Sequence, residues 1–262
     1  MPGLDIHCGI WKALEAAGIR ADANAGTSAG AFVAALNSAG TMQHGAEHLL
    51  RNLSDEDVIR KRFAWQLRIR RAESMCLPEP IIKLCYDMLP GDFRDLEKPL
   101  SIHATHELTG NPQELRAGCL PLAVAASMAL SGVWPPVNTI SPHGPFTALS
   151  SDGGTTENLP LPAMLQEYDE IWLLVAKRPL AYPERQTILS RMFWNAHLLL
   201  EHQVRETIST ARRIHKRVFV IRPDVESPRG TLHFDHTLID QAAACAALQI
   251  RRYLRGWEHG NG

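Results

Sequence analysis

Gly26-Thr27-Ser28-Ala29-Gly30 is the stretch that decides the fold of this 262-residue chain. Residues 19–25 before it predict a short extended segment, and residues 29–39 after it predict a helix of small and apolar residues that Gly40 ends. Ser28 therefore falls on a turn from strand to helix. Gly26 and Gly30 let strand and helix pack closely around such a turn, which presents the serine hydroxyl as a nucleophile. Taken alone, the pentapeptide also fits an ordinary helix start rich in small residues.

A second glycine-rich turn, Asp152-Gly153-Gly154, lies far downstream. By itself this sequence is also typical of an ordinary tight turn. Beside Ser28 it suggests a base, because Gly153 and Gly154 let the backbone at Asp152 approach the serine turn. The helix after Ser28 would direct its first amide, that of Ala29, at the centre where negative charge develops. We therefore predict Ser28 as nucleophile and Asp152 as base, with surroundings that raise the pKa of the carboxyl.

A Ser–His–Asp triad is the alternative arrangement. His233 or His236 satisfies the order Ser, Asp, His, but a chain with 12 histidines offers such candidates by chance. In the α/β-hydrolase fold the nucleophile follows several strands. Only 27 residues precede Ser28, so a dyad in which Asp152 takes the proton directly is the better interpretation.

Composition excludes several function classes. The 27 Lys and Arg residues nearly balance 28 Asp and Glu, which gives no reason to expect a nucleic-acid partner. The five cysteines are scattered and form no CxxC pair, so we expect a reducing compartment, with no disulfide framework and no zinc site. His103-x-x-His106 lacks a third ligand at a suitable spacing, and we expect neither a metal nor an organic cofactor. Without a signal peptide or an apolar run near the roughly 18 residues of a membrane span, a cytoplasmic location is expected.

Helices and strands are predicted to alternate along the chain, which favours an α/β fold with a mostly parallel sheet covered on both faces. No linker is evident, so residues 1–262 are interpreted as one domain. The predicted strands are residues 100–105, 146–150, 171–176 and 217–221, and the predicted helices are residues 6–17, 43–53, 79–88, 121–130, 186–215 and 237–254.

Four segments occur in an order that resembles one known family. They are AGTSAGAFVAAL at Ala25–Leu36, HATHELTG at His103–Gly110, ASMALSGVWPPV at Ala126–Val137 and SDGGTTENLPLP at Ser151–Pro162. The chain resembles the patatin-like phospholipases over most of its length. The resemblance implies a three-layer α/β/α fold and hydrolysis of lipid esters, of phospholipase A or lysophospholipase type, with Ser28 and Asp152 as the dyad and a lipid or phospholipid as substrate.

The sequence departs from this family at its start. Family members begin with an apolar strand and a glycine-rich loop whose amides form the oxyanion hole, whereas only Pro2-Gly3-Leu4-Asp5 stands before the first predicted helix. Gly3 and Leu4, with Ala29, are the candidate donors. We expect slow or absent turnover in the chain as given, because each lost donor costs about 10²–10³ in rate. The alternatives are a weak or inactive lipid- or protein-binding module, and an acyltransferase or thioesterase with the same dyad.

The segment at residues 60–71 carries six positive charges and no negative one. Basic residues mixed with aromatic ones suit an anionic lipid surface, so we expect peripheral membrane contact here. The alternative is a surface element whose arginines are simply solvated. The residues predicted to make the contact are Arg60, Arg62, Phe63, Trp65, Arg68, Arg70 and Arg71.

Overall fold

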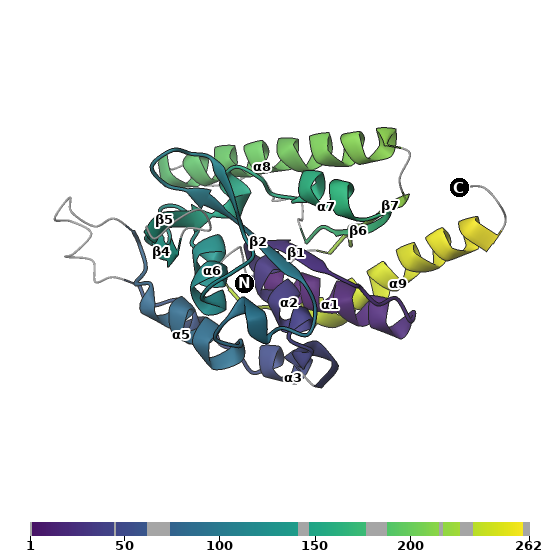
Figure 1. The fold of residues 1–262 in the computed structure, drawn as a ribbon, viewed down its shortest axis with the longest axis horizontal. Coiled ribbons are helices and arrows are strands. Elements are labelled where there is room, and N and C mark those ends of the chain that lie inside the picture. Colours follow the sequence, from purple (N-terminus) through teal and green to yellow (C-terminus); the bar gives the residue numbers. More distant parts are fainter. Residues whose placement is uncertain are drawn as a thin grey trace.

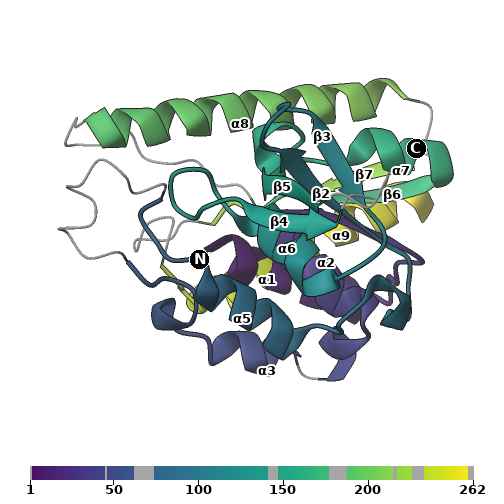
Figure 2. The same ribbon diagram turned by 60° about the vertical axis from the view of Figure 1, so that its left-hand side comes forward.

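The computed structural model describes residues 2–44, 46–61, 74–140, 147–176, 188–214, 217–225 and 233–258. Figure 1 shows the strands between two groups of helices, with α7 and α8 on one side and α1, α2, α6 and α9 on the other, and Figure 2 gives the same arrangement from another side. The helices are α1 (Pro2–Ala16), α2 (Ala29–Ser38), α3 (Ala46–Arg51), α5 (Glu79–Met88), α6 (Leu120–Met128), α7 (Leu161–Glu167), α8 (Ile188–Arg213) and α9 (Thr237–Glu258).

The strands form two sheets. A five-stranded sheet has the order β1-β2-β5-β4 with β3 also paired to β2, and β6 pairs with β7 in the second. The strands are β1 (Asn24–Thr27), β2 (Leu100–His106), β3 (Pro112–Leu115), β4 (Val137–Ile140), β5 (Thr147–Asp152), β6 (Glu170–Leu174) and β7 (Arg217–Ile221).

The α/β class predicted from the sequence is confirmed, but the central sheet is mixed rather than mostly parallel. β1 and β2 run parallel, as do β6 and β7. β3 and β5 both run antiparallel to β2, and β4 runs antiparallel to β5. For the β2–β3 and β4–β5 pairs the reason is that each pair is a hairpin, and a short connection between neighbouring strands forces them to run antiparallel.

The helices α1, α2, α6 and α9 contribute most of the core. α6 is buried at eight of its nine residues, and α2 packs Phe32 and Leu36 into the same cluster. Gly18 and Gly40 end α1 and α2 with φ of 73° and 72°, as their positions in the sequence predict. Among the helices of the described residues, none combines the length and apolar content needed to cross a bilayer.

Candidate active site

Ser28 stands between β1 and α2 in a backbone conformation that side chains rarely adopt. Its φ of 55° and ψ of −128° make it the one non-glycine residue with positive φ in the described part of the chain. Gly26 permits this turn, because a Cβ there would lie 2.6 Å from both the Ala31 Cα and the Gly30 carbonyl oxygen. The sharp turn holds the Ser28 side chain out from the end of the strand.

Asp152 is carried to the serine turn by β5. Asp152 pairs with Ala104 of β2, and the Asp152 amide donates to the Ala129 carbonyl at 3.0 Å. The chain then turns tightly at Gly153, where a Cβ would lie only 2.1 Å from the His103 carbonyl oxygen. This close approach requires glycine, as the sequence predicts, and it brings two segments more than a hundred residues apart into one site.

The hydroxyl of Ser28 donates to Asp152 Oδ2 at 2.7 Å. The other carboxylate oxygen, Oδ1, accepts the Gly154 amide at 2.8 Å. The Asp152 side chain is buried, with 4% of its residue surface exposed, and burial raises its pKa to about 6 despite the two hydrogen bonds that favour the charged form. The two motifs thus meet in the geometry that the sequence predicts, and the carboxyl is a stronger proton acceptor than an exposed aspartate.

Ser127 is a component of the site that the sequence reasoning missed. Its hydroxyl accepts the Ser28 amide at 2.8 Å and donates to the His103 carbonyl at 2.6 Å. Ser127 is fully buried in α6, where every other residue is apolar. A single hydroxyl in an otherwise apolar buried helix needs hydrogen-bond partners. This isolated serine was the sequence feature that could have identified Ser127. The bond satisfies the Ser28 amide and so fixes the strained turn.

His103 lies directly beneath this turn. Its Nδ1 donates to Glu157 Oε2 at 3.0 Å, while the Glu157 carbonyl accepts the Thr27 hydroxyl at 3.2 Å. The imidazole therefore braces the strand on which Ser28 sits against the segment that follows Asp152. In this arrangement His103 has a supporting role.

The first turn of α1 approaches the first turn of α2. A Cβ on Gly3 would lie 3.0 Å from the Ala29 Cβ, and one on Gly30 would lie 3.3 Å from His7 Nε2. Gly3 and Leu4 are helical rather than part of a loop, and the Leu4 side chain is buried in the core. First-turn amides have no partner within their own helix. The backbone amides of Gly3 and Leu4 therefore lie close to the Ser28 turn.

The two histidines of the triad alternative have partners elsewhere. His236 contacts Asp5 through Nδ1 at 2.8 Å, and His233 contacts Asp55 at 2.7 Å, so neither reaches Ser28. In the described residues no group of three or more His, Cys, Asp or Glu is arranged to hold a metal. Of the basic segment at residues 60–71, only Arg60 and Lys61 belong to the described residues, and both are exposed.

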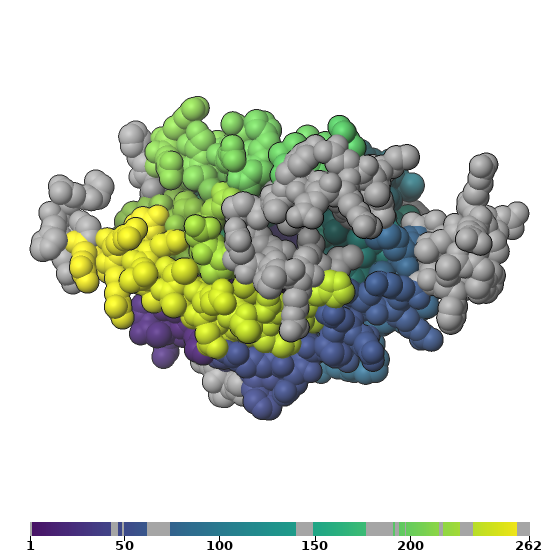
Figure 3. Space-filling view, turned by 180° about the vertical axis from the view of Figure 1, so that it is seen from behind, coloured from purple at the N-terminus to yellow at the C-terminus, as the bar shows by residue number. Residues whose placement is uncertain are grey.

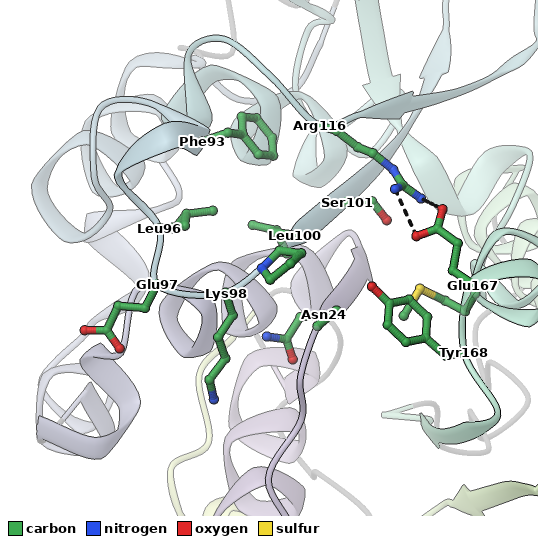
Figure 4. Close-up of a pocket in the computed structure, with 13 residues that line it drawn as sticks. Asn24, Phe93, Leu96, Glu97, Lys98, Leu100, Ser101, Arg116, Glu167 and Tyr168 are labelled. Atoms are coloured by element: carbon green, nitrogen blue, oxygen red, sulfur yellow. Dashed lines mark hydrogen bonds and ion pairs between the residues drawn. The ribbon is translucent and has the colours of Figure 1, made fainter.

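The cavity drawn in Figure 4 is separate from the dyad. It measures about 330 Å³ and is lined by Asn24 at the start of β1 and by the ion pair of Arg116 with Glu167, whose shortest contact is 2.6 Å. Ser28 follows the other end of β1, about 13 Å along the strand. The cavity lies at the start of β1 and Ser28 follows its end, so the cavity is not part of the site.

A sequence profile of the patatin-like phospholipases matches residues 6–165, more than half of the chain, including Ser28 and Asp152. The chain belongs to the patatin-like phospholipase family. Similar proteins include uncharacterized NTE family proteins of Mycobacterium bovis and of two strains of Mycobacterium tuberculosis. Each is 29% identical over 156 residues, which are 59% of this chain and 40% of the relative. The patatin-like chain therefore aligns with less than half the length of these relatives.

Proposed function

We propose that this patatin-like chain is a lipid acyl hydrolase that cleaves carboxylic esters through Ser28 and Asp152. The observation that carries the proposal is the 2.7 Å hydrogen bond from the Ser28 hydroxyl to a buried carboxylate. The pKa of about 6 leaves Asp152 mostly ionised at neutral pH, yet basic enough to take a proton in the transition state. Family membership supplies the substrate class, an ester of a lipid.

The reaction runs in two steps. Ser28 Oγ attacks the ester carbonyl while Asp152 Oδ2 takes its proton, and that proton passes to the departing alcohol as the acyl-enzyme forms. Water then attacks the acyl-enzyme, with Asp152 first accepting a proton from the water and then returning one to Ser28. Side chains and water provide every proton transfer in this sequence.

The oxyanion of each tetrahedral intermediate needs hydrogen-bond donors. We assign the Ala29 amide at the start of α2, together with the amides of Gly3 and Leu4 at the start of α1. The contact between Gly3 and Ala29 supports this assignment, because it brings both helix ends to the nucleophile. Removing one such donor is expected to lower kcat by about 10²–10³.

A lipid substrate also agrees with the surface beside the dyad. α8 crosses the Asp152 turn, where Gln203 donates to the Thr155 carbonyl at 3.3 Å and Leu200 approaches Gly154. The neighbouring Leu199 is 67% exposed. An exposed apolar side chain on the part of α8 that crosses the Asp152 turn is suited to contact with acyl chains.

The decisive experiment measures hydrolysis of a short p-nitrophenyl ester and of phospholipid micelles by the wild type and by Ser28→Ala. Turnover that Ser28→Ala abolishes supports the proposal. Its absence on both substrates, in a folded protein, favours the non-catalytic binding module. An acyltransferase is distinguished by adding an acceptor alcohol and measuring transfer against hydrolysis.

The oxyanion assignment has its own matched pair of variants. Gly3→Pro removes one amide at a helix position that tolerates proline, whereas Gly3→Ala adds a Cβ and keeps the amide. A fall in kcat of about 10²–10³ in the proline variant alone identifies the Gly3 amide as a donor. Equal activity of the two variants removes Gly3 from the oxyanion hole.

A further inference from the structure

A basic groove lies between the C-terminal half of α8, strand β7 and the C-terminal half of α9. Figure 3 shows α8 in green and α9 in yellow along this end of the molecule. The groove has a volume of about 620 Å³, within the range of small-molecule sites. Its lining residues are Arg205, Ile208, Ser209, Arg212, Arg213, Val220, Arg222, Gln249 and Tyr253.

The charge of the groove is unbalanced. Four arginines line it, and within the described part of the chain no carboxylate does. Glu201 neutralises part of this charge, since it accepts Arg222 through both oxygens at 3.0 and 3.1 Å and Arg205 at 3.1 Å. Arg212 and Arg213 are exposed and form no ion pair with any described residue. Two guanidinium groups therefore remain available for an anion.

Hydrogen bonds within the protein hold the floor of the groove in place. Gln249 of α9 bonds the backbone of Arg222 in both directions, at 2.9 and 2.8 Å. The Tyr253 hydroxyl donates to the Val220 carbonyl at 3.1 Å, and its ring packs edge-on against Phe219. A rigid floor lowers the entropy lost on binding, because few side chains must be ordered.

The helix dipole explains only part of this arrangement. Cations at the end of a helix are favourable, which accounts for Arg212 and Arg213 in the last turn of α8. It does not account for Arg205, two turns earlier, or for Arg222, which directly follows β7. Arginines of α8 and the arginine after β7 converge on one preformed groove, and such a set matches the oxygens of a phosphate group.

We infer that the groove between α8, β7 and α9 binds a phosphate group, either of a soluble phosphate ester or of an anionic lipid headgroup. The two uncompensated guanidinium groups match the one to two negative charges of a phosphate better than the single charge of a carboxylate. Ile208, Val220 and the Tyr253 ring give the ligand an apolar neighbour. The site is distinct from the dyad and does not depend on ester hydrolysis.

The test uses full-length protein carrying Ser28→Ala, so that no lipid is consumed. Binding of glycerol 3-phosphate is measured by calorimetry, with glycerol as the uncharged control. Flotation with vesicles of phosphatidylglycerol and phosphatidylcholine, against phosphatidylcholine alone, measures headgroup binding. The groove variant is Arg212→Gln with Arg213→Gln, and a thermal melt verifies its fold.

The matched control is Arg251→Gln with Arg255→Gln. Both residues are exposed on α9, and at about 100° per residue they lie roughly 120–160° around the helix from Gln249 and Tyr253. The control thus removes the same charge at the same end of the molecule but outside the groove. Nonspecific attraction to an anionic surface would weaken equally in both variants.

We expect the groove variant to bind about ten- to hundredfold more weakly and the control to change by less than about threefold. Binding of glycerol 3-phosphate identifies soluble phosphate esters as ligands, and binding of phosphatidylglycerol vesicles alone identifies the lipid headgroup. Absence of binding in both measurements, or equal losses in both variants, overturns the inference. Because the background lacks the nucleophile, neither result depends on the acyl hydrolase proposal.

Discussion

Replacing Ser28 by glycine is expected to give a more stable protein than replacing it by alanine. The Ser28 backbone has φ 55°, a conformation that any Cβ disfavours. Ser28→Ala and Ser28→Gly both remove the hydroxyl and its bond to Asp152, so that loss cancels between them. The two variants differ in whether the Cβ, and with it the backbone strain, remains.

Two opposing free energies set the size of the effect. Holding a side chain in this conformation costs about 1–3 kcal/mol, which Ser28→Ala keeps and Ser28→Gly relieves. Glycine makes the unfolded chain more flexible, which costs the folded state about 0.4–1 kcal/mol. Ser28→Gly is therefore expected to unfold with a free energy about 1 kcal/mol higher than Ser28→Ala, a difference of about 2–4 °C in Tm for a chain of this size.

Urea and thermal denaturation followed by circular dichroism measure this difference. The control is Ala34→Gly in the middle of α2, where the backbone is helical and glycine should cost about 1 kcal/mol. The reasoning fails if Ser28→Gly is no more stable than Ser28→Ala while Ala34→Gly shows its usual loss. The strain would then be absent, and the presentation of the hydroxyl would need another explanation.

Four further predictions concern activity and membrane binding. Burial raises the pKa of Asp152 to about 6, so kcat/KM should fall about tenfold per pH unit below that value, which a pH–rate profile measures. The folded state also gains stability while this carboxyl is protonated. That stability is lost as the pH rises through the folded-state pKa, which urea melts at several pH values measure. Ser127→Ala leaves the Ser28 amide unsatisfied, so it should lower kcat more than it raises KM and reduce stability by about 1–3 kcal/mol; unchanged kcat in a folded variant contradicts the positioning role. Leu199→Gln should reduce hydrolysis of phospholipid micelles but not of a short soluble ester, whereas Leu248→Gln, at another exposed leucine on α9, should affect neither. Charge reversal in the basic segment should weaken flotation with anionic vesicles, most clearly at low salt, and equal flotation of variant and wild type would favour the solvated-surface alternative; the residues reversed are Arg68, Arg70 and Arg71.

The sequence by itself determined the elements whose signals are local. The helix over Glu79–Met88 and the strand over Arg217–Ile221 have the bounds that the sequence predicts, because periodicity and flanking residues act within a few positions. The positions of Ser28 and Asp152 followed for the same reason. Glycines beside Ser28 and Asp152 indicate that the backbone there packs closely against another segment. A few neighbouring residues are therefore enough to predict each turn.

Tertiary structure alone decided what depends on distant contacts. The strand over Pro112–Leu115 is short and polar, and it forms only because β2 supplies an edge for it to pair with, which is why the mixed sheet was not predicted. The pKa of Asp152 rises because other parts of the chain bury it. Ser127 reaches the Ser28 amide from a helix about a hundred residues away. The basic groove joins arginines of α8 with Arg222, which follows β7, over a floor from α9. Burial and convergence depend on where remote segments pack, and no local pattern encodes that.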